Sequence, residues 1–110
     1  MNKEFLAGLS FRSEEIELEG HKFKVVEMNA STAEKYESSL YKIVNNSVKY
    51  DASKAKTKLV LLTLCDENGK RIYNDNDYGL VENLPSHIVN EIFNVASGLN
   101  NLDVEETEKN

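Results

Sequence analysis

The chain has 110 residues and a formal net charge of -6, with 40% hydrophobic and 29% charged residues. This length corresponds to one domain, and the composition is that of a globular protein with a small core. The acidic balance argues against non-specific binding to DNA or RNA, which depends on Lys and Arg at phosphates. The longest apolar run, residues 59–65, is too short to span a bilayer, and we expect neither a membrane segment nor a signal peptide. A single cysteine, Cys65, excludes a disulfide within the chain and indicates a reducing compartment.

The N-terminal residues 2–9 place Phe5, Leu6 and Leu9 at helical spacing. A helix this short is unstable alone, so its apolar face needs a partner. That partner is either the core of the same subunit or another chain, and the sequence leaves both readings open. We therefore name Phe5, Leu6 and Leu9 as the candidate surface for partner binding or self-association.

Residues 15–28 alternate between apolar and charged side chains around Gly20, which predicts a β-hairpin. Glutamates occupy the outer face of the first strand and lysines that of the second. Opposite charges across a strand pair contribute roughly 0.2–1 kcal/mol each. A lone hairpin is marginal in water, so we expect its apolar face to pack on the rest of the domain.

A first long helix is predicted from the capping-box sequence Ser31-Thr32-Ala33-Glu34 to about Asn45-Asn46, where Asn favours a helix end. Its apolar positions follow helical spacing: Ala33, Tyr36, Leu40, Ile43 and Val44.

A second helix is predicted to begin at Asp51 or Ser53 and to run to Cys65. The apolar run 59–65 also suits a buried strand, but no turn signal precedes it, which favours a continuous helix. Asp66-Glu67-Asn68-Gly69 then predicts a turn.

A short extended piece at Ile72 and Tyr73 and a brief helical turn through Leu80 and Val81 are expected next. Ser86 is the expected N-cap of the last helix, and Gly98 marks its end. The apolar face of this helix is formed by Ile88, Val89, Ile92, Phe93, Ala96 and Leu99.

These elements predict an α+β fold that is mainly α, with an N-terminal β-hairpin packed on a small bundle of about three helices. One domain is expected over residues 1–100. Residues 101–110 carry several acidic side chains and little apolar surface, and they are expected to form a disordered acidic segment.

Candidate metal sites are the oxygen-rich stretches 66–69 and 74–77. An EF-hand loop needs Gly at position 6 and Glu at position 12, and neither stretch meets that spacing. We therefore expect turns and helix caps here, and no bound metal.

No catalytic constellation is present in the sequence. Cys65 lies in an apolar run that would bury it and leave it inert, and no motif links it to His21 or His87. The scattered glycines form no phosphate-binding loop. The basic run Lys54, Lys56 and Lys58 is interpreted as a solvated helix face. We expect no catalytic residues, no cofactor and no enzymatic activity.

The order of the features carries more information than any one of them. The segment "FLAGL" at Phe5–Leu9 precedes the hairpin, and a capped helix start follows at Met28–Glu34. Then come "LVLLTLCDENGKRIYNDND" at Leu59–Asp77 and "LPSHIVNEIFNVASGLN" at Leu84–Asn100, followed by an acidic end. In the order and composition of these segments, nearly the whole chain resembles the tail assembly chaperones of long-tailed bacteriophages and prophages.

The resemblance implies a non-catalytic protein that binds the tape-measure protein, keeps it soluble and helps tail-tube subunits assemble around it. It also implies a homo-oligomer that associates in open, helical arrangements, as heterologous contacts do when their rotation does not close. Such a protein would work in the cytoplasm of the bacterial host and would not be retained in the mature virion. The resemblance further implies a longer form made by ribosomal frameshifting in many members. The alternative interpretation is a small acidic regulator or inhibitor of mobile-element origin that binds a host protein.

Overall fold

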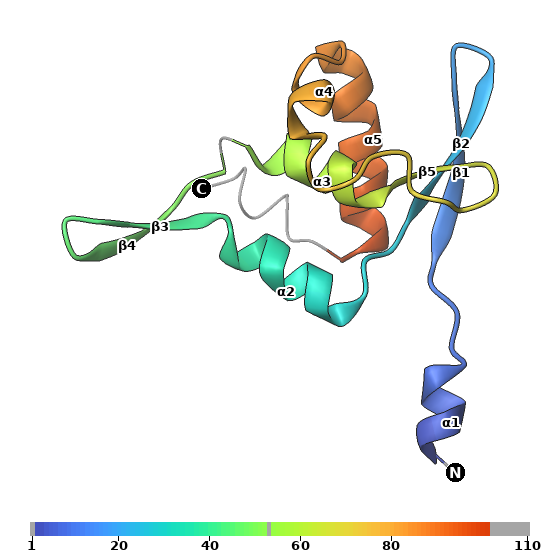
Figure 1. Cartoon of the computed structure of the whole chain (residues 1–110), viewed down its shortest axis with the longest axis horizontal. Helices are drawn as coiled ribbons and strands as arrows, with labels where there is room; N and C mark the ends of the chain where they lie inside the picture. Colours follow the sequence, from blue (N-terminus) through green and yellow to red (C-terminus); the bar gives the residue numbers. More distant parts are fainter. Residues whose placement is uncertain (1, 53, 102–110) are drawn as a thin grey trace.

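The computed structural model describes residues 2–52 and 54–101 as an α+β fold (Figure 1). The helices are α1 (Asn2–Ala7), α2 (Ala30–Ser38), α3 (Ala55–Thr63), α4 (Tyr78–Glu82) and α5 (Ser86–Leu99). The strands are β1 (Ser13–Leu18), β2 (His21–Val26), β3 (Tyr41–Val44), β4 (Ser47–Tyr50) and β5 (Leu64–Asp66). They form a three-stranded sheet in the order β1-β2-β5 and a separate two-stranded sheet, β3-β4.

The N-terminal hairpin is confirmed. β1 and β2 pair antiparallel through a two-residue turn, Glu19-Gly20, in which both residues have positive φ, as type I′ turns require. The register places Glu15 opposite Lys24 and Glu17 opposite Lys22, so the expected pairing of opposite charges across the strands is present.

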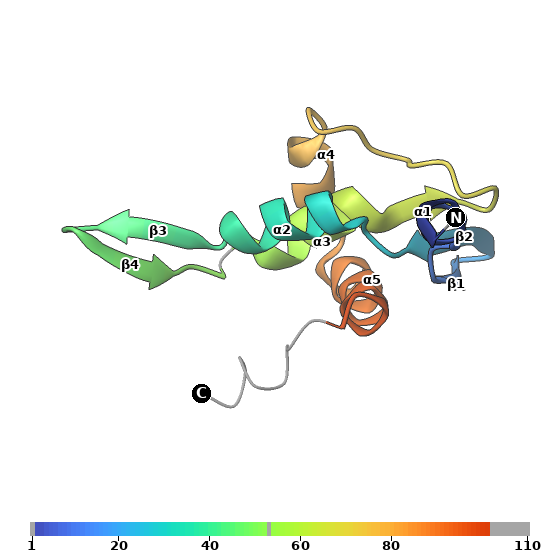
Figure 2. The same ribbon diagram turned by 90° about the horizontal axis from the view of Figure 1, so that it is seen from below.

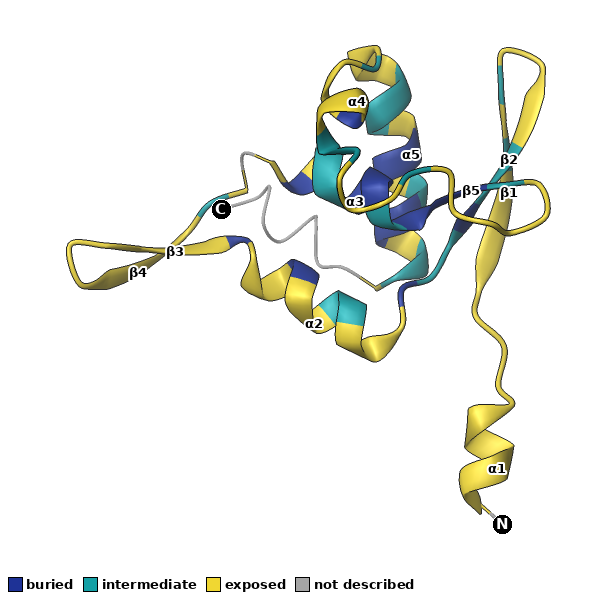
Figure 3. Cartoon of the chain, in the orientation of Figure 1, coloured by how far each residue is buried: buried dark blue, intermediate teal, exposed yellow. Residues whose placement is uncertain are grey.

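The core lies where α5 packs against α3 and against the strands β1 and β2 (Figures 1 and 3). Its fully buried apolar residues come from β2, α3, α4 and α5: Val25, Leu59, Val60, Val81, Ile92 and Ala96. The predicted apolar face of the last helix is confirmed, because all six of its residues belong to the core or pack against it.

The expected first long helix is wrong in its second half. α2 ends at Ser38, and residues 41–50 form an antiparallel hairpin turning at Asn45-Asn46. The two consecutive asparagines both adopt positive φ, 52° and 65°, as the central residues of a type I′ hairpin turn do, whereas a helix commonly ends with a single such residue. Tyr, Ile and Val on both sides of this turn favour strands, and that preference outweighs the helical spacing.

The second helix is also shorter than predicted. α3 ends at Thr63, and Leu64–Asp66 continues as β5, which pairs with β2. Residues 59–63 of the apolar run therefore belong to the helix α3, and residues 64–65 belong to the strand β5. The strand half is stabilised by an edge of the hairpin that sequence periodicity cannot reveal.

Three predicted caps are corrected. Asn29, and not Ser31, caps α2, its side chain accepting a hydrogen bond from Thr32 N. Ser86 is the first residue of α5, and Pro85 takes the N-cap position. Gly98 lies within α5; beyond the C-cap Asn100, Asn101 adopts positive φ.

The α+β class and the N-terminal hairpin are therefore confirmed, whereas the description as mainly α with a bundle of about three helices is not. In the described ranges 2–52 and 54–101, no helix has the length and apolarity needed to cross a bilayer. The acidic segment expected at 101–110 lies, apart from Asn101, outside the described residues.

Candidate functional site

The N-terminal arm, residues 2–11, projects away from the body of the domain (Figure 1). No residue of α1 is buried, and Phe5 is 70% exposed. The arm also exposes Leu6, Leu9 and Phe11. The reading in which Phe5, Leu6 and Leu9 cover the core of their own subunit is therefore wrong in this structure. The arm presents an apolar surface to solvent.

A second apolar surface lies on the β3-β4 hairpin, which projects from the end of α2 as a two-stranded ribbon (Figures 1 and 2). Every residue of both strands is exposed, and Ile43 is exposed by 79%. The register pairs Tyr41 with Tyr50 and Ile43 with Val48. Residues that face each other across a strand pair share one face of the ribbon, so these four side chains form its apolar face.

The opposite face of the hairpin is basic. Lys42 lies directly across from Lys49, and like charges in that position are destabilising. Asp51 forms an ion pair with Lys42 and offsets part of that repulsion. Sequence reasoning missed this surface because the Asn-Asn turn was interpreted as a helix end. The alternation of aromatic or β-branched residues with lysine on both sides of the turn is the signal that predicts it.

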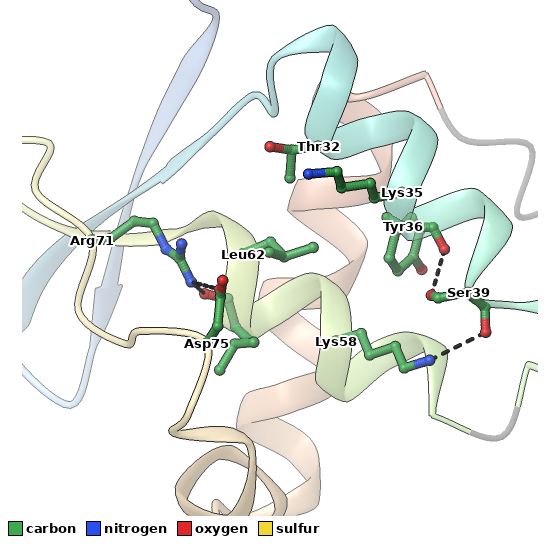
Figure 4. A pocket seen from close by; sticks show the side chains of 9 residues that line it. Thr32, Lys35, Tyr36, Ser39, Lys58, Leu62, Arg71 and Asp75 are labelled. Carbon is green, nitrogen blue, oxygen red and sulfur yellow. Dashed lines mark hydrogen bonds and ion pairs between the residues drawn. The ribbon is translucent and has the colours of Figure 1, made fainter.

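A groove of about 310 Å³ lies between α2, α3 and the loop after β5 (Figure 4). Leu61 and Leu62 of α3 and Tyr36 of α2 give it an apolar lining. Its charged lining residues are Lys35, Lys58, Arg71 and Asp75. The groove is therefore apolar between walls that carry an excess of positive charge.

Backbone contacts hold two of these cations in place. Lys58 Nζ donates to the carbonyl of Ser39 at 3.2 Å, and Arg71 Nη2 donates to the carbonyl of Leu61 at 3.0 Å. Arg71 also lies 3.4 Å from the carboxylate of Asp75. Positions fixed in this way lose less side-chain entropy when an anion binds.

Tyr36 is a buried residue of the groove lining that carries a polar hydroxyl. Its hydroxyl donates to the carbonyl of Ala55 at 3.2 Å and so links α2 to the start of α3. Burial is the main cause that raises the pKa of Tyr36 to about 12, with smaller contributions from Tyr50 and Glu37. Tyr36 is thus a structural residue that holds one wall of the groove.

Cys65 is buried within β5, as the sequence predicted. Burial raises the pKa of its thiol, which keeps it protonated and poorly nucleophilic. The two histidines are both exposed, His21 at the start of β2 and His87 in the first turn of α5.

The oxygen-rich stretches act as turns. The Asp66 carboxylate accepts hydrogen bonds from the backbone N–H groups of Asn68 and Lys70, and that of Asp77 accepts from Asn74 N. Among the residues that the structure describes, no group of three or more His, Cys, Asp or Glu could hold a metal ion.

The basic run at 54–58 was expected to form a solvated helix face. In the structure, two of its lysines contact aromatic side chains of α4 and α5. Lys54 lies over the ring of Tyr78, and Lys56 lies over the ring of Phe93 at 5.7 Å from its centroid. Lys56 also donates to the side chain of Asn90. These cations therefore help to pack α3 against α4 and α5.

The molecule is thus a small α+β body carrying two apolar projections and a basic groove. This fold is similar to that of a solved structure described as "Structure of bacteriophage HK97 tail assembly chaperone", with a TM-score of 0.63 and a sequence identity of 20%. The match covers 89% of this chain and 96% of that chain. The resemblance predicted from the sequence is confirmed at the level of the fold. No family model matches the chain, and no curated protein matches its sequence significantly.

Proposed function

We propose that this protein is a phage tail assembly chaperone that acts by binding other chains and not by catalysis. The observation that carries the proposal is the pair of exposed apolar projections on a body with the chaperone fold. Exposed apolar patches of this kind mark protein-binding surfaces in soluble proteins.

The proposed partners are the tape-measure protein and the tail-tube protein of the same phage or prophage. An elongated helical partner exposes apolar surface until the tail tube encloses it. The N-terminal arm and the β3-β4 hairpin would cover parts of that surface and keep the partner soluble. The proposed site of action is the cytoplasm of the bacterial host, before the virion is complete.

Self-association is proposed through the same surfaces. The arm is a short amphipathic helix without a packed face, and the hairpin is a two-stranded sheet without one. A helix packed on a hairpin stabilises both. The two lie far apart on the molecule (Figures 1 and 2), so such a contact would join different copies head to tail.

The test is co-expression with the tape-measure protein, followed by measurement of its soluble fraction and of co-purification. The arm variant is Phe5→Ser with Leu6→Ser and Leu9→Ser, and the hairpin variant is Ile43→Ser with Val48→Ser. We expect both variants to lower the soluble yield of the partner. The matched control is Leu80→Ser, because Leu80 is 60% exposed on α4, outside both projections.

Failure of the unmodified protein to co-purify with the tape-measure protein contradicts the proposal. Equal losses in the control and in the two surface variants contradict the assignment of the surfaces. Sedimentation of each variant alone separates self-association from partner binding.

A further inference from the structure

The basic groove extends beyond the α2-α3 cleft. A second cavity, of about 360 Å³, shares Ser39 and Lys58 with the first and continues toward the base of the β3-β4 hairpin. We call the two cavities together the trough. It is lined by five cationic and two acidic side chains: Lys35, Lys42, Lys54, Lys58, Arg71, Asp51 and Asp75. This trough has a local excess of three positive charges in a chain whose net charge is -6.

The end of the described chain lies beside the start of α2, one of the helices that form this trough. The side chain of Asn100 accepts a hydrogen bond from Met28 N at 2.8 Å, and Met28 directly precedes the N-cap of α2. Arg12 also donates to the carbonyl of Leu99, the last residue of α5. Thr32, which lines the groove, is only four residues beyond Met28. The residues after Asn101 therefore start beside the N-terminal end of α2, the helix that forms one wall of the groove.

Residues 102–110 have the complementary chemistry. They carry four acidic side chains and one lysine, an excess of three negative charges, together with Leu102 and Val104. Acidic groups match the cationic walls, and the two aliphatic side chains match the apolar lining. A segment of nine residues spans up to about 30 Å, whereas the trough follows α2 from Thr32 to Ser39 over about 10 Å. The segment is thus long enough to pass around α2 and reach it.

We propose that residues 102–110 dock in this trough, so that the groove is a binding site for acidic peptides and the chain carries its own ligand. A covalently attached ligand has a millimolar effective concentration, which compensates for weak individual ion pairs. An acidic segment of another protein would have to displace residues 102–110 before it could bind. The inference does not depend on the proposed function.

The test uses the full-length protein with a nitroxide spin label on Thr107→Cys. Cys65 is buried and is not expected to take the label; mass spectrometry checks single labelling. We expect the amide NMR signals of Thr32, Lys35 and Lys58 to lose most of their intensity, while those at the Glu19-Gly20 turn keep theirs. The intensities should recover in about 1 M NaCl, where the Debye length is about 3 Å.

Two matched sets of substitutions complete the test. Replacing the four acidic residues of the segment by their amides (Asp103→Asn, Glu105→Gln, Glu106→Gln and Glu108→Gln) should restore the intensities. Lys35→Glu with Lys58→Glu should do the same, whereas Lys22→Glu with Lys24→Glu on the distant hairpin should not. Uniform broadening, broadening elsewhere, or no loss at α2 and α3 overturns the proposal. So does broadening transferred from a spin-labelled copy to a second, isotope-labelled copy, because it shows docking between chains.

Discussion

At the scale of single residues, Tyr36 makes the stability of the fold depend on pH. Burial raises its pKa to about 12, and an unfolded tyrosine titrates near pH 10. The folded state therefore favours the protonated phenol. The resulting stabilisation is complete below pH 10 and is lost as the pH rises through about 12.

The corresponding prediction compares Tyr36→Phe with the parent protein in denaturant unfolding at about pH 9 and about pH 11. The parent should lose stability between the two, and the variant should lose less. Below pH 10 the variant should be less stable by about 1 kcal/mol, because the carbonyl of Ala55 loses its donor. Tyr41→Phe, at an exposed position, is the control and should keep the parent's pH dependence.

Cys65 gives a second prediction at this scale. Its thiol is buried and its pKa is raised by burial, so a thiol reagent should react with it only when the protein unfolds. The measurement is the rate of labelling at neutral pH in buffer and in denaturant. Fast labelling in buffer would show that β5 opens readily from the sheet.

At the scale of elements, the Asn45-Asn46 turn specifies the second hairpin. Both residues have positive φ, a region that costs most residues roughly 1–2 kcal/mol and that Gly adopts freely. Asn46→Gly should therefore stabilise the hairpin and Asn46→Val should destabilise it. Amide hydrogen exchange in β3 and β4 should be slower in the Gly variant and faster in the Val variant, and exchange in α5 should not change. Equal changes in α5 would mean that the hairpin folds together with the core.

The elements that could be predicted from the sequence are those with strong local signals. The β1-β2 hairpin follows from strict alternation, and α5 from a regular apolar face that the core covers. β5 could not be predicted, because it becomes a strand only by pairing with β2, far away in sequence. The β3-β4 hairpin was open to prediction from its turn and its β-branched residues, but helical spacing at Leu40, Ile43 and Val44 competed with that signal.

The candidate surfaces also differ in whether the sequence predicts them. Phe5, Leu6 and Leu9 were identified because three apolar residues occur in a segment too short to fold alone. The groove could not be identified from the sequence, because its cations come from α2, α3 and the loop after β5, and only the tertiary fold brings these segments together. A surface built from one segment can be found in a sequence, whereas a surface built from three cannot.

At the scale of the whole molecule, the core and the projections are separate. The radius of gyration is 15.2 Å, against about 13 Å for a compact domain of this length. Stability should therefore depend on the core and hardly on the projections.

Thermal unfolding can test this separation. Leu59→Ala removes a fully buried side chain and should cost about 2–5 kcal/mol. The hairpin variant Ile43→Ser with Val48→Ser changes exposed residues and should shift stability by no more than about 0.5 kcal/mol per site. A large loss in the hairpin variant would show that β3-β4 is part of the cooperative unit.

The separation of the two projections on one body has a kinetic consequence. Two modest contacts on the same molecule bind a long polypeptide by avidity, which can exceed either single affinity by about 10²–10⁴-fold. When a competing subunit displaces one contact, only the weaker remaining contact is left, and the complex then dissociates quickly. In the proposed function, the two projections would therefore combine tight binding with fast release and would need no input of chemical energy.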